Sequence, residues 1–167
     1  MGREAEFGAH LYAKNRYHMT ERGLEPETGI CDHFGTAQSR NMPHTILVAD
    51  DDPVMHLLME HHLGNAGHKI ISANNGREAI EMAKRELPHL IVLDVRMPEV
   101  GGLMTLKELK ETEATKAIPV IIVTVHHDPT TKRECELSGA AAFLIKPVRP
   151  GELFVEMRRL LPGSEAG

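Results

Sequence analysis

The chain has 167 residues, 41% of them hydrophobic and 26% charged, which suits one globular domain with a sizeable core and an appendage. A formal net charge of -5 and a pI near 6.1 argue against a basic nucleic-acid-binding surface. No apolar run approaches the roughly 20 residues needed to span a bilayer, and the amino terminus lacks a signal-peptide pattern. We therefore expect a cytoplasmic protein that contacts neither nucleic acid nor membrane. Its two cysteines, Cys31 and Cys135, lie in very different segments and are expected to be reduced thiols.

Residues 1–43 differ in character from the rest of the chain. They are polar, contain several glycines and prolines, and show no sustained hydrophobic periodicity. We expect an amino-terminal extension that is disordered or of artificial origin, with residues 23–42 as a linker. The alternative is a partner-binding helix over residues 4–19, where Phe7 and Leu11 lie on one side.

After this extension, short apolar runs alternate with windows of helical spacing, and residues 44–163 form the predicted domain. Asp52 followed by Pro53 predicts a capped helix start, and Asp128 followed by Pro129 repeats this signal. The window after Asp128 is mostly polar, so its helix is expected to be the mobile element. The residues at helical spacing are Val54, Leu57, Leu58 and His61 in the first helix, Ala79, Ile80 and Ala83 in the second, Leu103, Leu106 and Leu109 in the third, and Leu153, Phe154, Met157, Leu160 and Leu161 in the last.

This alternation of strands and helices predicts an α/β protein with a doubly wound parallel sheet and helices on both faces. The predicted strands are near-continuous apolar runs, as expected where a sheet is covered on both sides. They span residues 46–49, 69–73, 90–93, 120–123 and 143–145.

Four of the apolar runs end on a polar group. The groups are Asp50 and Asp51 after the first run, Asp94 after the third, Thr124 after the fourth and Lys146 after the fifth. Because the carboxyl ends of parallel strands share one rim, these groups are expected to converge where open α/β sheets bind ligands. Crowded carboxylates favour a hard cation, and the hydroxyl and ammonium favour an oxyanion beside it. The sequence therefore predicts a Mg²⁺ site that handles a phosphoryl group.

With their flanking residues, these run ends resemble the motifs of the response regulator receiver domain of two-component signalling. Four strings carry the resemblance, in the family's order: ILVADDDP, LIVLDVRMP, PVIIVTV and AAFLIKPV. The resemblance covers roughly Thr45 to Leu161 and implies a five-stranded sheet of flavodoxin-like order 2-1-3-4-5. No output domain is expected after it, so the chain resembles a stand-alone receiver.

The resemblance assigns the reacting group and the metal. Asp94 matches the phosphoacceptor. Asp50 and Asp51 match the acidic pair, Asp51 as a direct ligand of Mg²⁺ and Asp50 acting partly through water. Asp94 and the backbone carbonyl of Arg96 complete the implied ligands of Mg²⁺, which is the implied cofactor.

The resemblance also assigns a switch. Thr124 matches the switch hydroxyl, Lys146 the phosphate-binding lysine, and Phe143 the rotating aromatic. Asp94, Thr124 and Lys146 thus form the implied catalytic set. After phosphorylation, Thr124 and Lys146 are expected to turn to the new oxygens, and Phe143 to fill the space that Thr124 leaves. The Lys146–Pro147 peptide bond resembles one that is cis in the family.

These roles imply a phosphoacceptor switch of a two-component system or phosphorelay. A histidine kinase or a histidine phosphotransfer protein is the expected phosphohistidine donor, and a downstream protein is the expected target. A phosphorylation-dependent homodimer stays open. The chain is not expected to be an enzyme beyond self-phosphotransfer and slow autodephosphorylation.

Three other functions compete with this one. A receiver-like docking module would use the same fold without phosphorylation. A Mg²⁺ phosphohydrolase with Asp94 as nucleophile typically has a second Asp two residues later, where this chain has Arg96. A flavodoxin-like cofactor binder needs a phosphate loop rich in Ser, Thr and Gly after the first strand, where this chain has three aspartates.

Three positions are expected to tune the rate of the reaction. Receivers usually have a small residue after the switch Thr, where this chain has Val125, so slow phosphorylation by small donors is expected. Arg96 and His126 match the two positions that flank the phosphoryl group and adjust its lifetime. Gly101 stands where an acidic loop residue is more usual, which affects loop rigidity rather than the metal ligands.

Eleven histidines give only weak evidence of a further metal site. No clean i, i+4 ligand pair occurs among those on or near the first predicted helix, namely His56, His61, His62 and His68. Too few ligands for a structural metal lie together at Cys31, Asp32 and His33.

Overall fold

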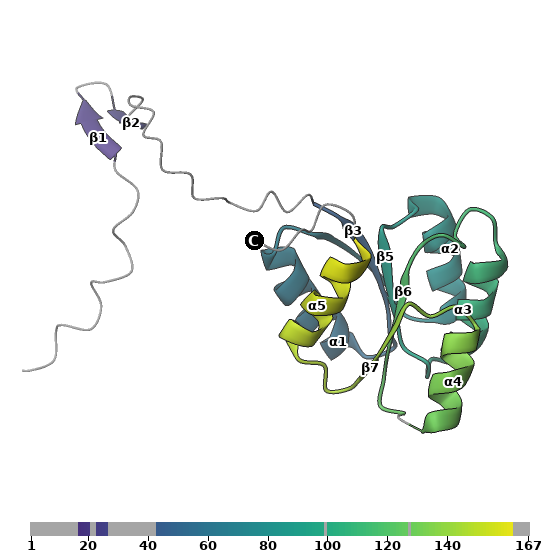
Figure 1. Ribbon diagram of the computed structural model, residues 1–167. Helices are drawn as coiled ribbons and strands as arrows, with labels where there is room; N and C mark the ends of the chain where they lie inside the picture. The colour runs from purple at the N-terminus through teal and green to yellow at the C-terminus, as the bar shows by residue number, and fades with distance from the viewer. Residues whose placement is uncertain (1–16, 21–22, 27–42, 99, 127, 162–167) are drawn as a thin grey trace, which may run out of the picture. The chain divides into compact units, whose positions relative to one another are not determined.

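The computed structural model describes residues 17–20, 23–26, 43–98, 100–126 and 128–161 (Figure 1). The chain divides into two compact units, Met1–Thr36 and Ala37–Gly167. In the first unit, β1 (Tyr17–Thr20) pairs with β2 (Gly23–Pro26) in an antiparallel hairpin.

The hairpin contradicts two predictions for the amino-terminal part. The helix predicted over residues 4–19 is wrong for residues 17–19, which are extended. The linker predicted over residues 23–42 is wrong for β2, which pairs with β1. Tyr and Thr in β1 favour extended backbone, and few apolar residues lie at a spacing that could hold a helix against a core. The other residues of the predicted helix and linker lie outside the described residues. The cluster of Cys31, Asp32 and His33 also lies outside them.

Five parallel strands form one sheet in the second unit, in the order β4-β3-β5-β6-β7. They are β3 (Thr45–Ala49), β4 (Lys69–Ala73), β5 (Leu90–Leu93), β6 (Val120–Thr124) and β7 (Ala142–Ile145). Counted within this unit, the order is 2-1-3-4-5, so the predicted flavodoxin-like arrangement is confirmed. Ala49 lies opposite Leu93 in the register, so Asp50 and Asp94 leave neighbouring strands side by side.

Helices cover both faces of the sheet, as predicted (Figure 1). They are α1 (Pro53–Met59), the π-helix η1 (Glu60–Gly64) that continues it, α2 (Gly76–Glu86), α3 (Gly102–Glu111), α4 (Pro129–Leu137) and α5 (Pro150–Leu160). Helices α1 and α5 share a core with Ile46 and Val48, and α2, α3 and α4 share the other core with Leu47 and Ala49. Within α4 the buried residue is Cys135, so few apolar contacts hold this helix, and its mobility stays a prediction. Among the described helices, none has the length and apolar character to cross a bilayer.

Both predicted capped helix starts are confirmed. The Asp52 carboxylate accepts the Val54 amide at 2.9 Å, and the Asp128 carboxylate accepts the Thr131 amide at 2.8 Å. Each carboxylate satisfies an amide of the first turn that has no partner inside the helix.

The first helix buries residues other than those whose spacing predicted it. Met55 and Met59 of α1 and Leu63 of η1 are buried in the core that α5 shares. Exposed instead are the residues whose spacing predicted the helix: Val54, Leu57, Leu58 and His61. Both sets fit the helical period, so periodicity alone does not decide between them. Packing against β3 and α5 decides which face meets the sheet.

Three histidines lie at the amino ends of β3, β4 and β5. The His44 amide donates to His68 Nδ1 at 3.3 Å, and the Thr45 amide donates to His89 Nδ1 at 3.0 Å. The His44 ring centroid lies 5.6 Å from that of His68 and 5.1 Å from that of His89. Burial, and to a smaller extent the charge of His44, lowers the pKa of His68. The position of His68 therefore favours its neutral ring.

Candidate functional site

Three carboxylates meet at the carboxyl edge of the sheet, as the strand ends predicted. One oxygen from each of Asp50, Asp51 and Asp94 lies within 4.8 Å of the others. Asp50 and Asp94 are only 2% and 5% exposed, whereas Asp51 is exposed. The Asp94 amide donates to the Ala49 carbonyl at 2.9 Å, which holds the two strand ends together. The cluster is thus enclosed by the sheet and open on the side of Asp51.

Lys146 joins the two buried carboxylates. Its Nζ lies 2.6 Å from Asp50 Oδ2 and 2.6 Å from Asp94 Oδ2. The Lys146 side chain is mostly buried, and its amide donates to the Thr124 carbonyl at 2.9 Å. The cis Lys146–Pro147 bond implied by the resemblance is present. An ammonium group at a fixed place therefore bridges the predicted metal ligand and the predicted phosphoacceptor.

Burial and pairing act in opposite directions on the charged groups. Burial raises the pKa of Asp50, and hydrogen bonds from Lys146 and from the Asp52 amide reduce that rise without cancelling it. Burial by itself lowers the pKa of Lys146, but the hydrogen bonds to Asp50 and Asp94 outweigh it, so the Lys146 pKa is raised. Lys146 therefore stays protonated. Further positive charge near Asp50 would stabilise its ionised form.

Backbone amides hold the second oxygen of each buried carboxylate. The Asp52 amide donates to Asp50 Oδ1 at 3.0 Å, and the Arg96 amide donates to Asp94 Oδ1 at 3.0 Å. The structure therefore places the Arg96 backbone beside the phosphoacceptor candidate. Its carbonyl as a metal ligand stays a prediction.

Thr124 and Phe143 lie on the neighbouring strands β6 and β7. Thr124 is fully buried, and its hydroxyl accepts the His126 amide at 3.3 Å. Phe143 is half-buried and packs against the core under α2, α3 and α4. Their role in a switch between these strands stays a prediction.

The residues after Thr124 differ in exposure. Val125 is 56% exposed, so its side chain stands on the surface next to the site. His126 is half-buried, and its Nε2 is buried without a hydrogen-bond partner among the described residues. The predicted effects of Val125 and His126 on the reaction rate stay predictions.

His56 is a site residue that the sequence did not single out. Its Nε2 lies 2.7 Å from the backbone carbonyl oxygen of Asp50. The available signal was its place in the first turn of the helix that directly follows the acidic residues. Among several histidines without a ligand spacing, that signal was too weak to select it.

Gly102 lets α3 begin directly against the backbone that follows β5. A Cβ on Gly102 would collide with the Asp94 carbonyl oxygen and with the backbone of Val95. The Gly102 amide donates to the Val95 carbonyl at 2.9 Å. A glycine at this position therefore allows the close approach that holds the loop after Asp94.

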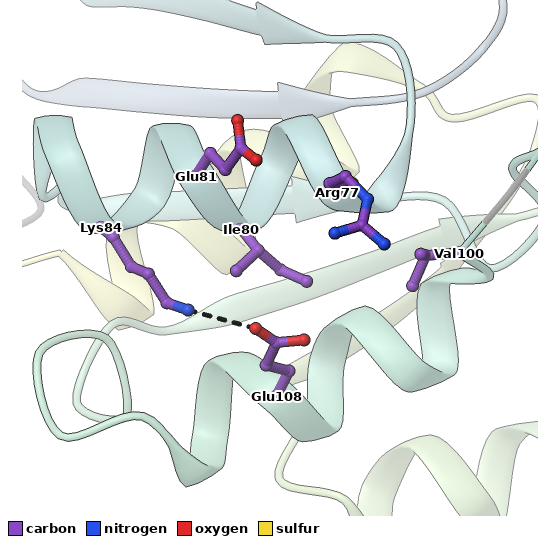
Figure 2. Close-up of a pocket in the computed structure, with 6 residues that line it drawn as sticks. All are labelled: Arg77, Ile80, Glu81, Lys84, Val100 and Glu108. Carbon is purple, nitrogen blue, oxygen red and sulfur yellow. Dashed lines mark hydrogen bonds and ion pairs between the residues drawn. The ribbon is translucent and has the colours of Figure 1, made fainter.

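A separate pocket of about 190 Å³ lies between α2 and α3 (Figure 2). It is lined by Arg77, Ile80, Glu81, Lys84, Val100 and Glu108. Lys84 of α2 pairs with Glu108 of α3 at 3.1 Å across it. None of the predicted site residues lines this pocket, and its mixed charges indicate no particular ligand, so we place the chemistry at the acidic cluster.

The acidic cluster fits a hard divalent cation. Its three carboxylates and the Lys146 ammonium leave two negative charges uncompensated among these four groups. Carboxylate oxygens are the ligands that Mg²⁺ prefers, and it keeps several waters, which suits a cluster open to solvent at Asp51. Asp50, Asp51 and Asp94 are therefore the residues that could hold it.

Known proteins are similar to this chain in sequence. The family model described as the response regulator receiver domain matches residues 46–158. Protein PilH of Pseudomonas aeruginosa is 33% identical over 118 residues, which cover 71% of this chain and 98% of PilH. The two-component response regulator ORR3 of Oryza sativa subsp. indica is 35% identical over 112 residues, which cover 66% of this chain and 85% of ORR3.

Solved structures are similar to it in fold. The chemotaxis protein CheY4 of Vibrio cholerae superposes with a TM-score of 0.68 and 29% identity, covering 71% of this chain and 99% of CheY4. The receiver domain of the sensor histidine kinase PA1611 from Pseudomonas aeruginosa gives a TM-score of 0.66 and 25% identity, covering 71% and 97%. That structure holds a magnesium ion coordinated in its active site cleft.

Proposed function

The chain belongs to the response regulator receiver family, and from that premise we propose that it is a Mg²⁺-dependent phosphoacceptor switch. Asp94 takes a phosphoryl group from a phosphohistidine of a histidine kinase or a histidine phosphotransfer protein. The observation that carries the proposal is the contact of Lys146 with both Asp50 and Asp94, with Asp51 beside them. This arrangement combines a nucleophile, an anion-binding ammonium and a cation site at one point.

In the proposed transfer, an oxygen of Asp94 attacks the phosphorus. The new O–P bond forms as the N–P bond of the donor breaks, and the electron pair stays on the donor imidazole. Bound Mg²⁺ would supply the charge neutralisation that lets an anion enter an acidic pocket. Lys146 moves from the Asp94 carboxylate to an oxygen of the transferred group. It keeps its contact with Asp50 Oδ2.

The proposed readout passes from Thr124 to Phe143. A phosphoryl oxygen on Asp94 accepts the proton of the Thr124 hydroxyl, and this charge-assisted hydrogen bond draws the side chain away from its present contact with the His126 amide. When Thr124 turns, the half-buried Phe143 of the adjacent strand fills the space. The face around β7 then changes shape, and a downstream protein reads that change.

Helix α1 offers a docking surface for the donor. Val54, Leu57 and Leu58 are 59%, 67% and 46% exposed on a helix that begins two residues after Asp51. Adjacent exposed apolar side chains of this kind mark protein interaction sites. A donor bound there would bring its phosphohistidine to the open side of the acidic cluster.

The decisive experiment is incubation with a small acyl-phosphate donor and Mg²⁺, followed by intact mass spectrometry. We expect a gain of one phosphoryl group that is absent in Asp94→Asn and without Mg²⁺. Asp128→Asn, which changes an exposed helix cap, is the matched control and should gain the group normally. If no donor adds a phosphoryl group, the chain is a docking module with a receiver fold.

We propose no turnover of external substrates. A phosphohydrolase of this kind needs an acid two residues after the nucleophile, and the exposed Arg96 stands there. Release of phosphate from a phosphate ester over many turnovers would contradict this part of the proposal.

A further inference from the structure

We infer that His56 is a positioning residue of the metal site. The inference rests on the proposed function, because it assigns His56 to the Mg²⁺ site proposed there. His56 Nε2 lies 2.7 Å from the Asp50 carbonyl oxygen. A carbonyl oxygen can only accept a hydrogen bond, so Nε2 carries the proton and donates it.

The other ring nitrogen shows that this contact is more than packing. His56 Nδ1 is buried and has no hydrogen-bond partner among the described residues. An aliphatic side chain would fill the same space without leaving a buried nitrogen unpaired. An imidazole at this position is therefore explained by what its Nε2–H does at Asp50.

The contact completes the immobilisation of Asp50. Its amide donates to the Ala73 carbonyl at 3.1 Å, Oδ1 accepts the Asp52 amide at 3.0 Å, and Oδ2 accepts Lys146 Nζ at 2.6 Å. The carbonyl oxygen is the remaining polar group of this residue, and His56 binds it. Four groups from different parts of the fold thus hold one metal-ligand candidate.

The held carbonyl belongs to the peptide bond that joins Asp50 to Asp51. That bond is planar, so fixing its oxygen also fixes the direction in which Asp51 leaves it. The exposed Asp51 side chain has no hydrogen bond to another described residue. The backbone therefore sets where the Asp51 side chain begins, and His56 is the side chain that holds this part of the backbone.

Loss of the contact should weaken Mg²⁺ binding rather than abolish it. A free Asp50–Asp51 peptide would have to be ordered when the metal binds, and this cost reduces affinity. Groups that orient metal ligands typically change affinity by about 10- to 100-fold. Because His56 acts through one peptide bond and not on a ligand atom, we expect the lower end, about tenfold.

The test compares three variants of the full, unphosphorylated chain by calorimetric titration with MgCl₂. His56→Leu removes the donor, and its dissociation constant for Mg²⁺ should rise about tenfold. His56→Gln places an amide N–H near the former Nε2–H and should restore affinity to within about twofold. His61→Leu makes the same change at an exposed histidine of the adjoining turn and should bind as the wild type does.

Two outcomes would overturn the inference. His56→Leu could bind Mg²⁺ with unchanged affinity, or His56→Gln could lose as much affinity as His56→Leu, which would assign His56 to packing alone. If His56→Leu does not fold, the tautomer of His56 in the wild type decides instead. A long-range ¹H–¹⁵N spectrum should show the Nε2–H form, and the Nδ1–H form would contradict the contact.

The same samples separate this inference from the proposed function. A wild type that binds Mg²⁺ but never gains a phosphoryl group refutes the phosphoacceptor role and leaves His56 as a positioning residue. A wild type that is phosphorylated at Asp94, while His56→Leu binds Mg²⁺ normally, refutes the role of His56 and leaves the switch standing.

Discussion

The two edges of one sheet treat polar groups in opposite ways. At the carboxyl edge, Asp50 and Asp94 are buried with Lys146 between them, and burial raises the pKa of Asp50. At the amino edge, His68 is buried as a ring whose pKa is lowered, and its Nδ1 accepts the His44 amide. The sheet therefore holds buried charged groups at its carboxyl edge and, in His68, a buried ring that favours its neutral form at its amino edge.

This difference indicates that the carboxyl edge is the one suited to bind a cation. Because the pKa of Asp50 is raised even with Lys146 beside it, its ionised form destabilises the fold at neutral pH unless a further cation joins it. A neutral imidazole that accepts a backbone amide stabilises the fold without any ligand. Removing charge should therefore stabilise the carboxyl edge and abolish its function, whereas the amino edge should matter for stability alone.

Lys146→Ala should give the largest effect. It removes the ammonium that faces both carboxylates, so the initial rate of phosphorylation by an acyl phosphate should fall about 100-fold. Lys132→Ala removes an exposed lysine paired with Glu136 and is the matched control. Equal rates in the two variants would show that the buried pairing has no part in the transfer.

Asp50→Asn tests how the buried carboxylate affects the free energy of unfolding. Folding favours protonated Asp50, so its contribution to stability is present at low pH and is lost as the pH rises through its raised pKa. At pH 7 without metal, the variant should have a higher free energy of unfolding than the wild type, by urea denaturation. With Mg²⁺ only the wild type should gain stability.

Asp51→Asn is the control for this prediction. Its carboxylate is exposed, so the change should also remove Mg²⁺ binding but alter metal-free stability by less than about 0.5 kcal/mol. A metal-free Asp50→Asn protein that is less stable than the wild type would contradict the claim that ionised Asp50 destabilises the metal-free fold.

Val125→Ala should have a moderate effect, confined to the carboxyl edge. Val125 is exposed next to Thr124, and a smaller side chain should give a small donor better access. We expect phosphorylation by acyl phosphate about threefold faster, which corresponds to less than 1 kcal/mol in the barrier. Val54→Ala, at an equally exposed valine of α1, should not change this rate; no acceleration in Val125→Ala would remove Val125 from the rate-tuning positions.

His68→Asn should give the smallest effect, at the amino edge. The lowered pKa of His68 means that its contribution to stability is complete above its ordinary pKa of 6.5 and is lost as the pH falls toward the lowered value. Asn offers an oxygen to the His44 amide and does not titrate. The melting temperature of the variant should therefore fall less from pH 7 to pH 5 than that of the wild type. His61→Asn is the exposed control. An unchanged slope in His68→Asn would show that this edge is not sensitive to acid.

Local patterns predicted the parts of the molecule that depend on neighbours in sequence. The caps Asp52 and Asp128 were predictable because each carboxylate binds an amide within three residues. The convergence of Asp50, Asp94 and Lys146 was predictable because parallel strands bring all their carboxyl ends to one edge. The helix proposed for residues 4–19 failed at β1 because weak periodicity leaves helix and strand close in energy.

Contacts between distant segments decided the rest. Whether Met55 or Leu57 of α1 is buried depends on how the helix packs against the sheet and α5, since both faces of this helix are apolar. Spacing alone also did not separate His56 from the other histidines, because its role depends on a carbonyl that the fold brings to its ring. The sequence thus specified the chemical groups of the site through strand periodicity and strand ends. Tertiary structure chose the buried helix face and the support behind Asp50, because those choices depend on packing that no local pattern contains.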